Sequence, residues 1–318
     1  MQTRQLGNTD LHITRIGLGT WALGGTGWFA SWGPQDDNDS IATIHRAIDL
    51  GINWIDTAAV YGLGHAEEII GRALKGRSER PFIFTKCSRK GTPDGKVESV
   101  LKADSIRQEV EDSLRRLQVD VIDLYQIHWP QPDEDVEEGW RTMAELKAAG
   151  KVRHIGVSNF NVSQLRRAQA IAPVSSLQPP YSLINRAVED EILPFCQQHN
   201  IGVIVYSPMA SGLLTGAMTP ERILSLPESD WRTRNPEYRE PRLSRNMALV
   251  TLLYDIGKRH DKTPGEVAIA WTLRHPSVTA AIIGGRRPEQ LDRVVGAAEF
   301  RLNDEELQEI DTFIQAHP

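Results

Sequence analysis

Short apolar segments alternate with longer amphipathic segments along most of the chain. A short apolar run bounded by turn residues predicts a buried strand, and apolar residues at helical spacing predict a helix. The predicted strands are residues 15–19, 52–55, 82–85, 121–127, 151–157, 175–178, 201–206 and 280–283. The predicted helices are residues 40–50, 65–75, 104–117, 136–148, 162–170, 187–199, 288–298 and, near the end of the chain, 303–314.

This order of elements predicts an α/β fold. Strands that are separated by helices pair in parallel through right-handed crossovers. Eight such units close into a (β/α)8, or TIM, barrel. Residues 4–14 form two short extended pieces around a Gly-Asn turn, which predicts an N-terminal β-hairpin at the bottom of the barrel. Because no change in composition marks a boundary, we expect residues 1–318 to form one domain.

One long segment after the seventh strand lacks this rhythm. Residues 207–245 contain several prolines, Trp231 and a series of arginines. Long irregular segments in compact domains are usually lids or binding loops. Since this segment follows a strand end, we expect it to lie over a pocket, and the alternative is a solvated surface loop.

Ionisable side chains stand at the ends of three predicted strands. Asp56 ends the second strand, and Tyr61 follows in the next loop. Lys86 ends the third strand, and His128 ends the fourth. Barrel enzymes place their chemistry at the carboxyl ends of the strands, so this pattern predicts a single pocket.

These residues also carry a family resemblance. Asp56, Tyr61, Lys86 and His128, together with Gly156-Val-Ser-Asn-Phe160 and Gln178, resemble the catalytic tetrad and cofactor signature of the aldo-keto reductases. The likeness extends from Gly17-Leu-Gly-Thr-Trp21 to Ile282-Ile-Gly-Gly-Arg286 and is greatest to the branch that contains bacterial general-stress-type reductases and potassium-channel β subunits. It implies NADP(H)-dependent reduction of an aldehyde or ketone.

The tetrad implies a division of roles in carbonyl reduction. A nicotinamide supplies the hydride, because no side chain can. Tyr61 is the expected proton donor, and we expect Lys86 to lower its pKa from about 10. Asp56 would keep Lys86 charged, while a neutral His128 would orient the carbonyl. Taken singly, each residue has a structural alternative: a loop cap for Asp56, a half-buried loop phenol for Tyr61, a surface ion pair for Lys86 and a structural imidazole for His128.

The cofactor prediction rests on the resemblance. No G-x-G-x-x-G motif opens a first strand–helix unit, so a Rossmann domain is not indicated. The resemblance implies cofactor contacts from Thr20, Trp21, Ser158, Asn159, Gln178, Tyr206, Ser207, Gly212, Leu213, Gly284, Arg286 and Gln290. Arg286 stands before the start of a predicted helix and could hold a 2′-phosphate, which favours NADP(H) over NAD(H). Val294 occupies the position where relatives usually have an adenine-contacting Asn, so that contact is not expected.

Four tryptophans are the expected walls of the substrate pocket. Trp21, Trp28, Trp32 and Trp129 stand near the predicted mouth of the barrel. Aromatic walls with few polar groups suit aldehydes or modest ketones. The alternative places Trp28 and Trp32 on the barrel surface and Trp21 in the core.

Composition excludes several other classes of function. The formal net charge of −6 gives no reason to expect nucleic acid or an anionic membrane as a partner. Cys87 and Cys196 lack metal or disulfide spacing, so no metal is expected, and without a signal peptide or membrane span we expect a cytoplasmic protein. The oligomeric state, the physiological substrate and the direction of the reaction stay open. Two rival functions also stay open: a cofactor-binding regulatory subunit and a sugar-phosphate barrel enzyme.

Overall fold

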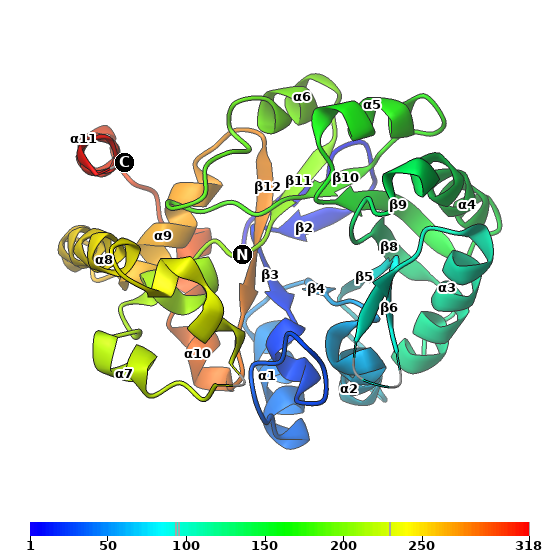
Figure 1. Cartoon of the computed structure of the whole chain (residues 1–318), viewed down its shortest axis with the longest axis horizontal. Coiled ribbons are helices and arrows are strands. Elements are labelled where there is room, and N and C mark those ends of the chain that lie inside the picture. The colour runs from blue at the N-terminus through cyan, green and yellow to red at the C-terminus, as the bar shows by residue number, and fades with distance from the viewer. Residues whose placement is uncertain (93, 95, 229, 318) are drawn as a thin grey trace.

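Eight parallel strands form a closed barrel in the computed structural model, which describes residues 1–92, 94, 96–228 and 230–317 (Figure 1). The predicted TIM barrel is confirmed. Each barrel strand pairs with the next one along the chain, and the ring closes where the first strand pairs with the last. Around the ring, the strands are β3 (Ile16–Gly19), β4 (Trp54–Asp56), β5 (Phe82–Cys87), β8 (Ile122–Ile127), β9 (Val152–Ser158), β10 (Ser176–Gln178), β11 (Gly202–Val205) and β12 (Val278–Gly284).

Helices surround the barrel on its outer side (Figure 1). Most lie between consecutive strands, as the predicted order required, whereas the C-terminal helix packs on the long helix that follows the seventh strand. The helices are α1 (Asp37–Asp49), α2 (His65–Leu74), α3 (Ala103–Leu117), α4 (Val136–Ala148), α5 (Val162–Gln169), α6 (Ile192–Gln198), α7 (Pro220–Leu224), α8 (Arg242–Lys258), α9 (Pro264–Leu273), α10 (Pro288–Asp292) and α11 (Asp304–Ala316). Among the described residues, no helix is both long and apolar enough to span a membrane.

Alternate side chains of each strand enter two different apolar clusters. Ile55 on β4 and Ile83 on β5 pack outward against the helices, while Trp54 and Phe84 fill the inside of the barrel. Because side chains alternate along a strand, the residues two positions after Trp54 and Phe84 also point inward, at the end of each strand. The same alternation turns a set of polar groups toward the carboxyl end of the barrel interior: Asp56, Lys86, His128, Ser158, Gln178 and Tyr206.

The N-terminal hairpin closes the opposite end of the barrel. Its strands β1 (Thr3–Gln5) and β2 (His12–Thr14) pair antiparallel. Leu6, Leu11 and Ile13 are fully buried and belong to the same cluster as Trp54 and the other inward-facing apolar residues. The predicted hairpin at the barrel bottom is therefore confirmed, and the barrel is open for chemistry only at its other end.

Several predicted boundaries were wrong. Helix α1 begins three residues early because the Asp36 side chain caps it by accepting hydrogen bonds from two backbone N–H groups. The helix predicted at 187–199 covers only Ile192–Gln198, and the one predicted at 288–298 is interrupted after Asp292 and continues as the 3₁₀ turn η7 (Val295–Ala298).

Three helices (α7, α8 and α9) and one hairpin were not predicted. Every residue of α9 is buried, so its apolar residues show no helical periodicity. Helix α8 likewise lacks a clear apolar stripe. Strands β6 (Arg89–Gly91) and β7 (Val97–Ser99) form a small hairpin directly after β5, at the carboxyl end of the barrel strands.

The long segment after β11 is mostly short helical turns. It contains η4 (Ala210–Thr215), α7, η5 (Trp231–Arg234) and η6 (Pro236–Tyr238) before α8 begins. Parts of it, including η4 and η5, line the large cavity at the barrel mouth, whereas Leu224 on α7 is 86% exposed. The segment therefore lies over the pocket as predicted, although one portion of it is solvated.

Candidate active site

A cavity of about 1290 Å³ opens at the carboxyl ends of the strands. Ligand pockets usually span roughly 300–1,000 Å³, so this cavity has room for a dinucleotide together with a small substrate. Nearly all of the predicted site residues line it: Thr20, Trp21, Trp28, Trp32, Asp56, Tyr61, His128, Trp129, Ser158, Asn159, Gln178, Tyr206, Ser207, Gly212, Gly284, Arg286 and Gln290.

A buried ion pair lies at the base of this cavity. Lys86 Nζ donates to Asp56 Oδ1 at 2.6 Å and to the Thr57 carbonyl at 2.8 Å, and Gln178 Nε2 donates to Asp56 Oδ2 at 2.8 Å. Lys86 is 1% exposed, so a surface ion pair is excluded. Separating the two partners of such a pair would leave an uncompensated buried charge, so Lys86 and Asp56 are held together.

Tyr61 stands above this pair with its ring against Lys86 and His128. It begins the 3₁₀ turn η2 (Tyr61–Gly64) after β4. Lys86 Nζ lies 5.3 Å from the centre of the Tyr61 ring, and the His128 ring meets it edge-on at 5.8 Å between centroids. Among the described residues the Tyr61 hydroxyl has no hydrogen-bond partner. The phenol is therefore held by its ring and borders the cavity.

A close glycine contact fixes the turn that carries Tyr61. Gly62 has φ +61°, and a Cβ there would lie 2.0 Å from the Gly24 carbonyl oxygen. Only glycine combines that backbone conformation with so close an approach. The contact joins η2 to η1 (Trp21–Gly24), so Trp21 and Tyr61 are positioned together, with their rings stacked at 6.4 Å.

The pKa of Tyr61 moves opposite to our prediction. Burial and the negative charge of Asp56 raise the pKa of Tyr61 well above 10. Burial lowers the pKa of Lys86, although Asp56 opposes that effect. The expected lowering of the pKa of Tyr61 is wrong because burial, the largest effect, and the negative charge of Asp56 both disfavour the phenolate. The phenol consequently keeps its proton at neutral pH.

His128 is a neutral imidazole at neutral pH. Burial lowers its pKa well below 6.5, and the positive charges of Lys86 and Arg89 lower it further. Its backbone N–H donates to the Cys87 carbonyl, which fixes the end of β8 against β5. The buried Nδ1 atom has no partner within the described residues. The ring therefore has unused hydrogen-bonding capacity beside Tyr61.

The next strand ends carry amide and hydroxyl groups that are partly satisfied by one another. Ser158 Oγ donates to the Gln178 carbonyl at 2.7 Å, and Asn159 Nδ2 donates to the His128 carbonyl at 3.0 Å. Tyr206 OH donates to Asn159 Oδ1 at 2.8 Å. Within the described residues no donor reaches Gln178 Oε1, which leaves an acceptor for a ligand amide.

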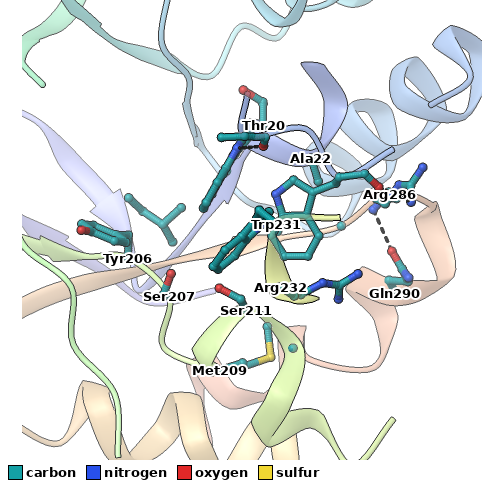
Figure 2. A pocket seen from close by; sticks show the side chains of 18 of the residues that line it. Thr20, Ala22, Tyr206, Ser207, Met209, Ser211, Trp231, Arg232, Arg286 and Gln290 are labelled. Carbon is teal, nitrogen blue, oxygen red and sulfur yellow. Dashed lines mark hydrogen bonds between the residues drawn. The ribbon is translucent and has the colours of Figure 1, made fainter. Parts of the chain in front are cut away.

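Most, but not all, of the remaining predicted cofactor residues line the cavity. Ser207 and Gly212 line the cavity, and Tyr206 lies at the opposite end of it from Arg286 and Gln290 (Figure 2). Leu213 does not line it, because its side chain is fully buried against Met218 and Tyr238. Thr20 lines the cavity and donates through its backbone N–H to the Asp56 carbonyl.

Arg286 is engaged by the loop that precedes α1. Its Nε donates to Gln35 Oε1 at 2.7 Å, its Nη1 to the Trp32 carbonyl at 3.3 Å and its Nη2 to the Pro34 carbonyl. The backbone N–H of Arg286 donates to Gln290 Oε1 at 2.7 Å, the dashed line in Figure 2. The helix that follows starts with Pro288 and is short. Three of the five guanidinium N–H groups make these contacts, which leaves two within the described residues for a phosphate.

Aromatic rings form the wall near Tyr61, and one of them was not predicted. Trp28 is 8% exposed and packs 6.0 Å from Tyr61, so a surface position for Trp28 is excluded. Trp231 stacks on Trp21 at 5.4 Å and meets Trp32 edge-on at 5.8 Å. Figure 2 shows Trp231 in the middle of the cavity view. The sequence placed Trp231 in the irregular segment but gave no sign of these partners.

Two arginines at the cavity were also missed. Arg232 pairs with Asp230 at 2.6 Å and lies over the Trp32 ring at 4.5 Å. Arg89, at the start of β6, lines the cavity beside His128 and Trp129. The signal for Arg89 was its place only three residues after Lys86, at a strand end. Val294, 6% exposed, borders the cavity at the predicted adenine end.

The family model called Aldo/keto reductase family matches residues 15–315. The chain therefore belongs to the aldo/keto reductase family. Members of this family use nicotinamide cofactors, and the chain is an oxidoreductase of the kind that acts on carbonyl or alcohol groups.

Individual relatives cover almost the whole chain. The Aldo-keto reductase YhdN of Bacillus subtilis (strain 168) is 39% identical over 318 residues, which are 99% of this chain and 94% of that protein. The NADH-specific methylglyoxal reductase of Escherichia coli (strain K12) is 34% identical, over 96% of this chain and 95% of its own. The solved glycerol dehydrogenase of Gluconobacter oxydans has a TM-score of 0.91 and 38% identity, covering 99% of this chain and 96% of that one.

Proposed function

We propose that the chain is an NADP(H)-dependent aldo-keto reductase that transfers hydride between nicotinamide and the carbonyl carbon of an aldehyde or ketone. In this proposal residues 1–318 act as a single catalytic domain. The observation that carries it is the convergence of Tyr61, neutral His128 and the buried Lys86–Asp56 pair at one end of a cavity with room for a dinucleotide. The named relatives act on methylglyoxal and glycerol, which supports a small oxygenated substrate.

The cavity suits a nicotinamide on chemical grounds. A carboxamide has both hydrogen-bond donors and an acceptor. Ser158, Asn159 and Gln178 border the cavity, and their hydroxyl and amide groups can accept from the donors and donate to the acceptor. Gln178 Oε1 is an acceptor without a partner among the described residues, and Tyr206 offers an aromatic face. When bound there, the reduced cofactor would supply the hydride.

The side chains supply the proton for the substrate oxygen and orient the carbonyl group. Tyr61 retains its proton because its pKa is raised. An alkoxide is about as basic as hydroxide and far more basic than a phenolate, so even a weakly acidic phenol can protonate it. Lys86 would then stabilise the phenolate that remains, since a nearby cation favours the charged form. His128, being neutral, can donate a hydrogen bond to the carbonyl oxygen and set its direction.

Replacing Tyr61 tests this chemistry. Tyr61→Phe keeps the ring that packs on Trp21 and Trp28 but removes the proton donor. We expect kcat for an aldehyde panel, followed at the nicotinamide absorbance, to fall by roughly 10²-fold or more, while the NADPH dissociation constant changes less than about threefold. Near-normal turnover in Tyr61→Phe would contradict the role.

The choice of NADP(H) over NAD(H) depends on Arg286. One relative is named NADH-specific, so family membership leaves this choice open. Arg286 borders the cavity and is the side chain best suited to a 2′-phosphate, because a guanidinium binds phosphate bidentately.

We expect Arg286→Ala to weaken NADPH binding by about 10-fold or more and NADH binding by much less. Fluorescence titration of both cofactors measures this directly. Glu79→Gln, an exposed substitution far from the cavity, serves as the control for handling and folding. Equal losses for the two cofactors would contradict a role in 2′-phosphate binding.

A further inference from the structure

Within the part of the chain that the structure describes, the substrate end of the cavity contains one cation without a carboxylate partner. Asp56 and Lys86 neutralise each other at 2.6 Å, and the neighbouring walls are aromatic or neutral. Arg89 is the exception. It starts β6, directly after the strand that carries Lys86, and it lines the cavity together with Tyr61, His128 and Trp129.

The Arg89 guanidinium is only partly satisfied. Its Nη1 donates to Ser99 Oγ at 2.6 Å, across the β6–β7 hairpin. Among the described residues no carboxylate lies within salt-bridge distance of Arg89. Buried Arg15, which also has no carboxylate partner in the described part of the chain, donates instead to three backbone carbonyls, and Arg116 pairs with Glu67 at 2.7 Å. A guanidinium has five N–H donors and stays protonated in proteins, so most of its capacity here is unused.

Arg89 is half-buried, which strengthens its effect on nearby groups. Burial lowers its own pKa, and its positive charge contributes to the lowered pKa of His128. The charge of Arg89 is therefore felt at the place where the substrate carbonyl would lie. A partly desolvated cation attracts an anion more strongly than a solvated one.

We propose that Arg89 forms an anion subsite, and that the substrates this enzyme prefers are carbonyl compounds carrying a carboxylate or phosphate group a few atoms from the carbonyl. This inference rests on the proposed reductase function and adds the substrate class to it. Tyr61 and His128 would meet the carbonyl, while Arg89 would bind the anionic end through its free N–H groups. The guanidinium geometry suits both carboxylate and phosphate.

Substrate pairs in which one member carries the anionic group and the other lacks the charge test the subsite. One pair is 4-oxobutanoate and its methyl ester, and the other is glyceraldehyde 3-phosphate and glyceraldehyde. For the wild type we expect kcat/KM to be roughly 10- to 100-fold higher for the anionic member of at least one pair, mostly through KM. The pair that shows the preference identifies the anion as carboxylate or phosphate.

Two variants with the same change of charge separate a local from a general effect. Arg89→Gln keeps a polar side chain that can donate to Ser99, and we expect it to reduce the charged-to-neutral ratio of kcat/KM to near one. Arg141→Gln removes an exposed arginine on α4, outside the cavity, and should preserve the ratio. A ratio that falls equally in both variants would assign the preference to net charge and overturn the subsite.

Inhibition gives a second measurement that needs no turnover of the chosen acids. Butanoate should compete with a neutral aldehyde at least 10-fold better than butanamide in the wild type, and this difference should vanish in Arg89→Gln. Equal kcat/KM within both substrate pairs, with equal inhibition by acid and amide, would refute the subsite while leaving the reductase function intact. Loss of all carbonyl reduction in the wild type would instead refute the proposed function.

Discussion

Glu109 is a buried carboxyl group beneath the turn that leads from β5 to Arg89. Its Oε2 accepts the backbone N–H of Ser88 at 3.0 Å, and its Oε1 accepts Ser105 Oγ at 3.1 Å. Ser88 Oγ in turn donates to the Trp129 carbonyl. Burial raises the pKa of Glu109 from 4.5 to about 7. Through Ser88, the carboxyl group of Glu109 therefore supports both the turn after β5 and the segment at Trp129 on the cavity rim.

This pKa makes a prediction about stability. Between about pH 4.5 and 7 the folded chain binds a proton at Glu109 that the unfolded chain has released, so the contribution of Glu109 to stability falls as pH rises through that window. At ~1.4 kcal/mol per pKa unit the loss is at most about 3.5 kcal/mol. Glu109→Gln lacks this titration.

Thermal unfolding of both proteins at several pH values measures the effect. We expect the melting temperature of the wild type, relative to Glu109→Gln, to decrease from pH 5 to pH 8. The exposed Glu79→Gln should follow the wild type at every pH. A wild-type and Glu109→Gln difference that does not change with pH would show that Glu109 does not titrate in this window.

Residue positions were easier to predict than residue partners. The strand ends at Asp56, Lys86 and His128 follow from counting apolar residues with a period of two, because the chain direction and the pleat fix which side chains face inward. The contacts of Arg286 with Gln35 could not be predicted, since the two residues are 251 positions apart and belong to loops. The raised pKa of Tyr61 depends on burial, which requires coordinates.

At the scale of elements, two loops from distant parts of the chain meet over the cavity. Trp231 on η5 stacks on Trp21 and contacts Trp32, and Arg232 lies over the Trp32 ring at 4.5 Å. Aromatic pairs of this kind contribute about 0.5–1.5 kcal/mol beyond the area they bury. The stack therefore holds the segment after β11 against the cavity.

Trp231→Ala should loosen this segment. Removing the indole should raise the rate of trypsin cleavage after Arg232 and Arg234 by about two- to tenfold, because cleavage follows the population of locally opened chains. Mass spectrometry of the fragments identifies the sites. Trp231→Phe keeps a ring for stacking and should be cleaved nearly as slowly as the wild type. Wild-type cleavage of Trp231→Ala would show that the stack does not hold η5.

The elements missed from the sequence share a physical cause. Helix α9 is buried on all sides, so the period that distinguishes helix from strand is absent. Its start nonetheless carries a capping box, in which Thr263 and Glu266 exchange side-chain and backbone hydrogen bonds, and this sequence signal would have located it. The β6–β7 hairpin is too short for any periodic pattern.

For the whole molecule, stability and chemistry are concentrated at opposite ends of the barrel. The N-terminal hairpin inserts Leu6, Leu11 and Ile13 at one end, and the polar strand ends surround the cavity at the other. This polarity was predictable, since eight alternating strands and helices favour a parallel barrel, and the carboxyl ends of parallel strands share one face. The path of residues 207–241 was not, because short helical turns held by long-range contacts leave no local pattern.

The hydrogen bonds between Arg286 and the loop before α1 affect how a measured cofactor affinity is interpreted. Three of the guanidinium N–H groups already donate to oxygens of Trp32, Pro34 and Gln35, so a phosphate that displaced any of them would contribute only the surplus over the bonds it replaces. A dissociation constant measured on this chain would in that case understate the strength of the arginine–phosphate contact itself. Differences in nucleotide affinity between such reductases can therefore originate in how strongly the arginine of each protein is hydrogen-bonded to carbonyl groups of that same protein.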